Sequence, residues 1–148
     1  MKITIPSGFV EAIGKEIDIL AHEALAEMAT TQIALIQIRA EKGIGLDDAP
    51  MPAYSAAYAR IKAKAGRSAA ERNLTWSGSM LRAIVVDRVA RDENGLFAEI
   101  KFATQEQAQI AAYNQGIAPW FGVSPSDQKT LTRVAMRRLE EVAATLNR

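Results

Sequence analysis

The longest regular pattern of apolar positions lies close to the N-terminus. It is carried by Phe9, Ile13, Ile17, Leu20, Ala24 and Met28. Spacings of three and four residues place these side chains on one face of a helix, so the pattern predicts a helix over residues 8–42. Such a helix would be roughly 50 Å long at 1.5 Å per residue. We therefore expect it either to bend near Thr30-Thr31 or to reach beyond its own domain.

A second pattern, with a period of two, occupies residues 84–103, IVVDRVARDENGLFAEIKFA. It reads as two strands joined at Asn94-Gly95, a pair that supplies the positive φ values of a type I′ hairpin turn. In the second strand an apolar set alternates with a largely polar one, which predicts an antiparallel sheet with one covered face. The apolar set is Leu96, Ala98, Ile100 and Phe102, and the other is Phe97, Glu99 and Lys101. The opening MKITI reads as another short strand.

Shorter helices are predicted between and after these elements. One starts near Tyr54, one turn runs through Ser79 to Arg82, and one follows the Thr104/Gln107 capping box and ends by Gly116. The last helix begins at Ser124-Pro125-Ser126-Asp127, which combines a cap, an early proline and an acidic third position. Its predicted buried face is Leu131, Val134, Ala135, Leu139, Val142 and Leu146.

These elements predict an α+β fold. It has a long N-terminal helix, a small antiparallel sheet with a β-hairpin at about 84–103, helices packed on one side, and a C-terminal amphipathic helix. The length of 148 residues suits a single domain over 1–148. Glycine and proline interrupt the helical pattern at 43–53, and small polar residues dominate 66–73, so both are expected to be flexible loops.

Composition changes this picture little. Apolar residues make up 49% and charged residues 24%, which is typical of a globular protein. The net charge of +1 gives no overall argument for a nucleic-acid or acidic partner. There is no cysteine, which excludes disulfides and thiolate chemistry. Charged residues interrupt the N-terminal region, and no run approaches the roughly 20 apolar residues of a membrane span, so neither a standard export signal nor a membrane segment is expected.

Candidate catalytic chemistry is sparse. His22 is the single histidine and lies within the predicted long helix, where a lone histidine is usually a surface or cap residue. Asp47-Asp48 is a pair of loop acids, typical of a solvated turn. The nucleotide-binding and nucleophile-elbow motifs are absent. We therefore expect no catalytic, cofactor-binding or metal-binding residues, and no enzymatic activity.

A basic segment covers residues 60–82, where Arg60, Lys62, Lys64, Arg67, Arg72 and Arg82 face one acid, Glu71. Two interpretations are open. The segment is either the solvated side of an amphipathic helix and its loop, or a surface for phosphate or for an acidic neighbour. Within the helix from Tyr54, the side chains of Tyr54, Tyr58 and Ile61 share one face, and Arg60, Lys64 and Arg67 share another.

Two tryptophans stand in predicted loops. Trp76 has two interpretations, a core residue or a contact at a subunit boundary, where tryptophan is enriched. Trp120 stands beside Phe121 in APWFGVSPSDQ, residues 118–128. Neighbouring side chains alternate in extended backbone, so we expect Phe121 to point inward against Ile100 and Phe102, and Trp120 to point toward a neighbouring subunit.

Two stretches resemble a known family. LTWSGSMLRAI, residues 74–84, is similar to an element of the phage virion morphogenesis (tail completion) family, through Leu74, Ser77, Gly78, Leu81 and Ile84. Residues 108–142 resemble the C-terminal block of that family, where a helix end leads through a proline-aromatic loop to an amphipathic helix. The matching residues there are Ala112, Gln115, Gly116, Pro119, Phe121, Gly122, Val123, Ser124 and Asp127. The chain departs from the family at Asn114, which replaces a frequent histidine, and in a shortened insert after Gly116.

The resemblance implies a structural protein of a tailed-phage virion. It would form a ring, of six copies by analogy, at the neck or the top of the tail, with other neck and tail proteins as partners. Localisation would be the virion, and the host cytoplasm during assembly. The expected subunit interface is Trp120, Trp76, Tyr54 and Tyr58. Arg60, Lys64 and Arg67 would face DNA in the lumen without sequence preference. The alternative is a nucleic-acid-binding module that uses the basic segment 60–82.

Overall fold

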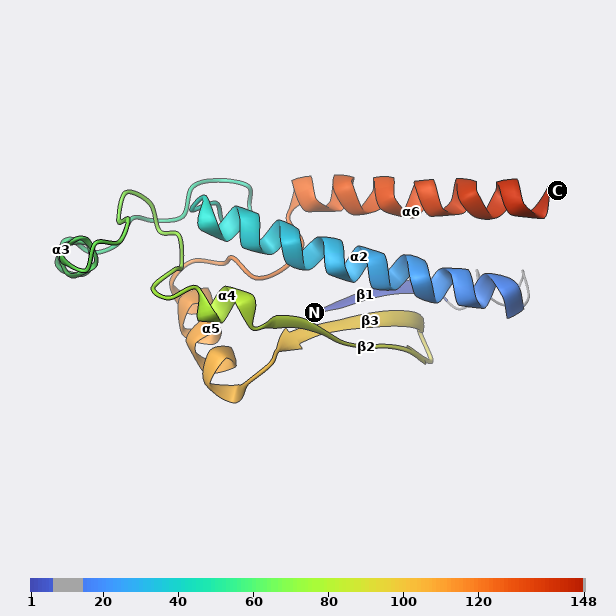
Figure 1. Ribbon diagram of the computed structural model, residues 1–148, viewed down its shortest axis with the longest axis horizontal. Coiled ribbons are helices and arrows are strands. Elements are labelled where there is room, and N and C mark those ends of the chain that lie inside the picture. Colours follow the sequence, from blue (N-terminus) through green and yellow to red (C-terminus); the bar gives the residue numbers. More distant parts are fainter. Residues whose placement is uncertain (7–14, 148) are drawn as a thin grey trace. The chain divides into compact units, whose positions relative to one another are not determined.

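The computed structural model describes residues 1–6 and 15–147 and has the predicted α+β fold (Figure 1). The chain divides into two compact units. Unit 1 comprises Met1–Ile33, Val85–Lys101 and Asp127–Arg148, and unit 2 comprises Ala34–Ile84 and Phe102–Ser126. The chain length favours one domain, yet each unit is assembled from segments distant in sequence. The two are therefore not consecutive domains on a linker.

Unit 1 contains most of an antiparallel sheet with the strand order β1-β3-β2. Strand β1 is Lys2–Pro6, β2 is Ile84–Asp92 and β3 is Gly95–Phe102. β1 pairs with β3 from Lys2↔Glu99 to Pro6↔Gly95. This arrangement confirms the strand at MKITI and the hairpin. The central strand β3 is more buried than β2, as a strand with neighbours on both sides should be.

The apolar set predicted for β3 is buried up to Ile100, but Phe97 departs from the alternation. It was assigned to the polar face, yet its side chain is buried. The ammonium of Lys2 lies 4.1 Å from its ring centroid and the guanidinium of Arg88 lies 5.5 Å away. The stems of long basic side chains therefore cover the ring while their charges stay in water.

The hairpin turn also differs from the prediction by one residue. The turn residues are Glu93 and Asn94, and Gly95 opens β3 at φ 133°. Asn94 does not have the positive φ that a type I′ turn requires. Instead its N–H donates to the Asp92 carboxylate at 2.9 Å, a local side-chain bond that aspartate commonly makes in turns.

Helix α2, Lys15–Glu41, contributes its first part to unit 1 and its last turns to unit 2. It continues without a break through Thr30-Thr31. The buried line runs through Leu25, Ala29, Gln32 and Ile36, while Leu20 and Met28 are only half-buried. Of the predicted stripe, Phe9 and Ile13 lie outside the described residues. Ala24 of the predicted stripe is buried, which confirms the stripe at that residue, and the buried line continues past Met28, where the predicted stripe ended.

The polar residue Gln32 lies on the buried line of α2, beyond the last residue of the predicted stripe. Gln32 is fully buried and its Nε2 donates to the Asp127 carboxylate at 3.0 Å. A buried amide is tolerated when it is hydrogen-bonded. A search for apolar spacing alone passes over such a residue, although it sits at the centre of the buried face.

Helix α6, Pro125–Leu146, completes unit 1, where α2 lies between α6 and the sheet (Figure 1). Glu27 of α2 pairs with Arg137 and with Arg138, whose Nε lies 2.6 Å from the carboxylate. Leu131 is buried, but Leu139, predicted to be on the buried face, is 42% exposed. The apolar face of α6 is thus only partly covered.

Unit 2 holds the three shorter helices. These are α3, Ala56–Lys64; α4, Ser79–Arg82; and α5, Gln105–Ile117. Ser55 caps α3 by accepting from the Tyr58 N–H, and Thr104 caps α5 by accepting from Gln107 N–H at 3.2 Å. The predicted capping residue Thr104 is confirmed. Helix α5 continues through Gly116, which was expected to end it, because Ala118 N–H still donates to Asn114 O.

The segment 43–53, expected to be a flexible loop, is held by hydrogen bonds within unit 2. Met51 N–H donates to Gly43 O at 2.7 Å, and Leu46 N–H donates to Pro119 O at 2.9 Å. Ile44 and Pro50 form an isolated antiparallel bridge. Gly43, at φ 71°, adopts the left-handed backbone that ends a helix. The second expected loop, 66–73, is exposed along its first residues and anchored at its end by buried Arg72.

Candidate functional site

The aromatic pair of the loop after α5 departs from the prediction at Trp120. Trp120 is 0% exposed and Phe121 is half-buried. The Trp120 ring lies 6.3 Å from the Phe102 ring and 5.6 Å from the Phe121 ring. The expectation that Trp120 faces a neighbouring subunit is therefore wrong. The contact expected between Phe121 and Phe102 is present, at 5.0 Å between ring centroids.

Two polar side chains, partly buried Gln115 and buried Arg39, explain why Trp120 points inward. The Gln115 carbonyl oxygen accepts from the N–H groups of both Trp120 and Phe121, each at 2.9 Å. Arg39, itself buried, donates to Trp120 O at 3.2 Å and to Gly122 O at 3.0 Å. These bonds curl the loop inward, so the alternation rule of extended backbone does not apply. The loop is structural rather than a free contact surface.

The candidate site is a groove elsewhere in unit 2, with a volume of about 580 Å³. We call it the aromatic groove. Its lining is Tyr54, Ser55, Tyr58, Arg72, Leu74, Thr75, Trp76, Ile110, Tyr113, Asn114 and Ile117. All three tyrosines of the chain and one of its two tryptophans are in this set. No acidic residue is.

Tyr54 organises one wall of the aromatic groove. Its hydroxyl accepts from the Leu74 N–H at 3.1 Å and from the Lys62 ammonium at 3.3 Å. Its ring lies 4.8 Å from the Arg72 guanidinium and 4.9 Å from the Tyr58 ring. Partial burial raises the pKa of Tyr54. Its hydroxyl oxygen accepts from both donors through its two lone pairs.

The apolar lining of the groove is unusually open to solvent. Tyr113 is 72% exposed and Trp76 is 43% exposed, and Tyr58, Ile110 and Ile117 are also exposed. Large exposed apolar patches with aromatic residues mark binding surfaces. Of the two interpretations of Trp76, the core residue is therefore wrong. Its exposure suits a contact residue.

A second hollow of about 520 Å³ continues from the groove across Ile117. The ordered loop after α2 and the end of α5 form its walls, with Leu46, Met51 and Pro119 among the lining residues. Both hollows belong to unit 2. The two hollows share Ile117, so they meet at the end of α5.

The cations of the basic segment have different environments in the structure. Lys62 is buried, with its ammonium 2.5 Å from Asn73 Oδ1, and burial lowers its pKa. Arg72 is buried and donates to Pro52 O at 2.7 Å and Ala53 O at 3.1 Å. Arg82 folds back onto the Ser77 carbonyl. With Arg67, which donates to the Trp76 carbonyl, four of the six cations are engaged by the protein's own oxygens.

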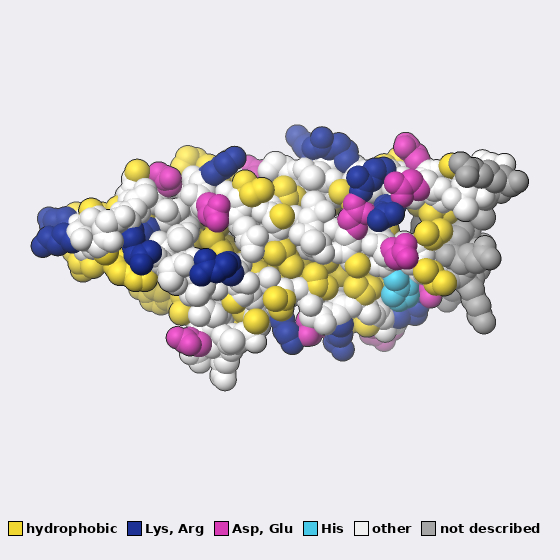
Figure 2. Space-filling view, viewed as in Figure 1, with side chains coloured by type: hydrophobic (Ala, Val, Ile, Leu, Met, Phe, Trp, Pro, Cys, Tyr) yellow, Lys and Arg dark blue, Asp and Glu magenta, His cyan; other side chains and the backbone are white. Residues whose placement is uncertain are grey.

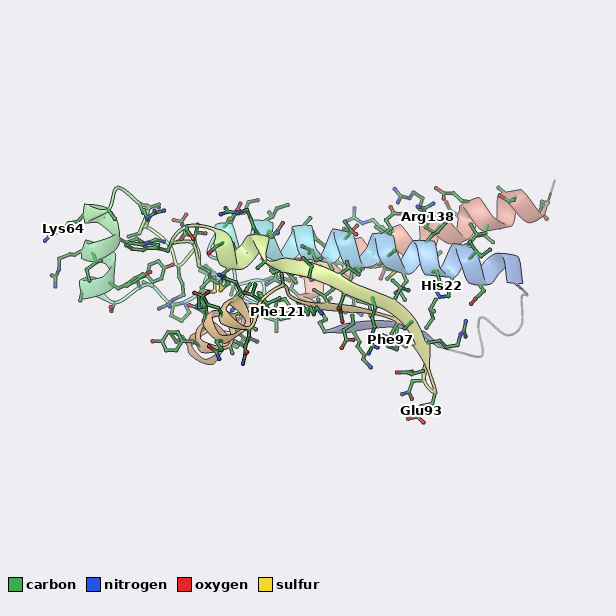
Figure 3. All side chains as sticks on the ribbon, turned by 60° about the horizontal axis from the view of Figure 1, so that its bottom comes forward. His22, Lys64, Glu93, Phe97, Phe121 and Arg138 are labelled. Carbon is green, nitrogen blue, oxygen red and sulfur yellow. The ribbon has the colours of Figure 1, made fainter. Side chains whose placement is uncertain are left out.

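The three residues expected to face DNA divide as well. Arg67 donates to the Trp76 carbonyl, and its guanidinium lies 5.1 Å from the Trp76 ring, at the groove. Arg60 and Lys64 stay exposed on α3, and Lys64 points into solvent (Figure 3). On the face drawn in Figure 2, Lys and Arg side chains gather at the α3 end beside hydrophobic ones.

The polar residues His22 and Asp48, which lie outside the groove, make contacts within the protein's own fold. His22 Nδ1 lies 2.8 Å from the Asp18 carbonyl, which is an ordinary contact within a helix. Asp48 accepts from Ser126 N–H at 2.8 Å and from its hydroxyl at 2.6 Å, bonds that lower the pKa of Asp48. Within residues 1–6 and 15–147, no group of His, Asp and Glu could hold a metal ion.

Sequence reasoning found Tyr54, Tyr58 and Trp76 but missed the α5 wall. Ile110, Tyr113 and Ile117 recur at spacings of three and four, as an apolar stripe on a helix does. That signal was present in the sequence. The sequence analysis used this segment only to predict where the helix begins and ends. The spacing of its apolar residues does not show whether they are exposed or buried.

Within the part of the chain that the structure describes, no helix is long and apolar enough to cross a membrane. No family model, curated protein or solved structure matches the chain.

Proposed function

We propose that this chain is a structural subunit of a tailed-phage particle, which assembles through the aromatic groove. It would form a ring at the neck or the top of the tail, completing the tail and joining it to the head. The observation that supports this most directly is the exposed groove, which gathers all three tyrosines and Trp76. A surface of this composition binds other chains through a few aromatic anchors.

The residues that carry the family resemblance support the same proposal, because their roles are structural. Leu74, Leu81 and Ile84 are buried, and Gly78 takes φ 78° before α4. In the second stretch, Gln115 binds the backbone of the aromatic loop, and Ser124 and Asp127 are buried at the start of α6. The residues that match the family therefore hold the fold together. This is expected of a protein that acts by binding other chains.

The proposal predicts self-association through the groove. The purified protein should form closed rings as its concentration rises, visible by negative-stain electron microscopy and by sedimentation velocity. Replacing Trp76 and Tyr113 together by serine should remove the rings, because both side chains are exposed anchors. The matched control replaces Ile19 and Ile38, which are exposed on α2 outside the groove, by serine and should leave the rings intact.

Circular dichroism and thermal unfolding would show that each variant keeps the monomer fold. A wild-type protein that stays monomeric at several hundred micromolar and does not associate with purified tails would contradict the proposal. So would rings that form equally well in the groove variant.

Nucleic-acid binding is a second candidate, favoured by one observation. Arg60 and Lys64 are exposed on α3, which carries no acidic side chain. Such cations give weak binding that falls steeply with salt. If these residues contact DNA, Arg60→Glu with Lys64→Glu should abolish duplex binding at low salt while ring formation persists. Unchanged duplex binding by this variant would remove the candidate.

A further inference from the structure

We propose that the aromatic groove receives helix α6 of a second copy of this chain. The inserted surface, which we call the α6 stripe, consists of Met136, Leu139, Glu140 and Ala143. This inference rests on the proposed function, since it names the partner of the groove. It adds that each copy presents two different binding surfaces, one in unit 2 and one in unit 1.

The α6 stripe has the geometry of a helix that binds in a groove. Met136 is 52% exposed, Leu139 is 42% exposed, and Ala143 is exposed as well. These residues are spaced by three and then four positions, so they lie above one another on a single side of the helix. Apolar anchors at such positions are the usual signature of helix-in-groove recognition.

The other exposed apolar residues do not offer this pattern. Within the described residues, the large exposed hydrophobic side chains outside the groove are Ile19, Ile38, Ile61, Val123, Met136 and Leu139. Only Met136 and Leu139 stand within one turn of the same helix. The chain therefore supplies one helical stripe that could fill its own groove in another copy.

The charges of the two surfaces are compatible. The groove is lined by Arg72 and bordered by Arg67 over Trp76, and no acidic side chain lines it. The stripe carries Glu140, which is exposed and has no ion pair among the described residues. The neighbouring Arg138 is already neutralised by Glu27 and Glu141. Because Arg72 is buried against the Pro52 and Ala53 carbonyls, Glu140 would meet the exposed guanidinium of Arg67 at the edge of the groove.

A contact between two different surfaces has a consequence for assembly. When the groove of one copy binds the stripe of the next, each copy still has one free groove or one free stripe. Such heterologous contacts close into rings or extend into filaments, whereas a contact between identical surfaces stops at a dimer. The inference therefore predicts the type of interface, which can be tested separately from the ring.

The test uses two single variants and their mixture. Tyr113→Asp disables the groove and Leu139→Asp disables the stripe, and both side chains are exposed in the monomer. Each variant alone should self-associate at least about 30-fold more weakly than the wild type, as loss of an anchor residue implies. An equimolar mixture should form one-to-one complexes by sedimentation velocity, because one intact stripe meets one intact groove.

The control variant is Ile19→Asp, which places the same charge on an exposed isoleucine of α2 and should assemble as the wild type does. Rings in Leu139→Asp, or a mixture that stays monomeric, would overturn the inference while the proposed function stands. A wild type that never self-associates would overturn both. Binding of a thymidine oligonucleotide that quenches Trp76 fluorescence, without self-association, would assign the groove to nucleic acid instead.

Discussion

At the scale of single residues, Arg39 shows how a charge can support a core. It lies on the buried side of α2 and donates to Gly45 O at 2.9 Å as well as to Trp120 O and Gly122 O. Charge-assisted bonds to backbone carbonyls satisfy groups that water would otherwise have to reach. Because Arg39 and Gln115 hold the loop, Trp120 is placed inside.

The two tryptophans should therefore differ sharply in their effect on stability. Trp120→Ala should lower the free energy of unfolding by about 3–5 kcal/mol, because it empties a fully enclosed site. Trp76→Ala should lower it by less than about 1 kcal/mol, since that ring is 43% exposed. Urea unfolding followed by circular dichroism measures both. Equal effects for the two variants would contradict the assigned orientations.

Asp48 should make unit 2 sensitive to acid. The Ser126 hydroxyl and N–H bind its carboxylate and lower its pKa in the folded state. A lowered folded pKa stabilises the protein fully above the ordinary aspartate value near about 3.9, and this stabilisation is lost as the pH falls further. Asp48→Asn keeps an acceptor at a residue with φ 60°, which asparagine also tolerates.

The measurement is urea unfolding of both proteins at several pH values. The difference in stability between wild type and Asp48→Asn should be constant from pH 7 to about pH 5 and shrink toward pH 3. A difference that grows on acidification would show that the carboxylate is not stabilised in the folded state.

At the scale of elements, patterns of neighbouring residues correctly predicted a strand and the first residues of two helices. Alternation identified β3, the capping residue Thr104 identified the start of α5, and Ser124 to Asp127 identified the start of α6. The same patterns failed to predict which side chains are buried, because burial depends on residues distant in the sequence. Gln32 is buried because Asp127 binds it, and Leu139 is exposed because no described segment covers it. Neither partner can be read from spacing along one helix.

Gly116 gives an element-scale prediction. It was read as the residue that ends α5, yet it lies inside the helix with open space around its Cα. Gly116→Ala should therefore stabilise the protein by about 0.5–1 kcal/mol, because alanine loses less backbone entropy in a helix. Gly122→Ala is the contrast. At φ 152° and with Leu46 at 3.0 Å from an added Cβ, it should destabilise. Chemical denaturation distinguishes the two signs.

At the scale of the whole molecule, the two units could not be foreseen from the sequence. Each is assembled from separated segments, and α2 contributes to both. The aromatic groove has the same origin, since its walls come from residues 54–58, 72–76 and 110–117. Sequence reasoning proposed Tyr54, Tyr58 and Trp76 as contact residues one by one. Their convergence on α5 depends on long-range packing, which periodicity does not encode.

The placement of the two tryptophans makes assembly visible by fluorescence quenching. In the monomer, acrylamide should quench exposed Trp76 readily and buried Trp120 poorly, so the quenching curve should bend downward. If the groove is the interface, raising the concentration into the assembled range should protect Trp76 and flatten the curve. Trp76→Phe retains an aromatic ring and should leave one protected tryptophan whose quenching does not change with concentration. Rings in which Trp76 stays as accessible as in the monomer would place the interface on another surface, because a side chain at an interface loses contact with solvent and with the quencher.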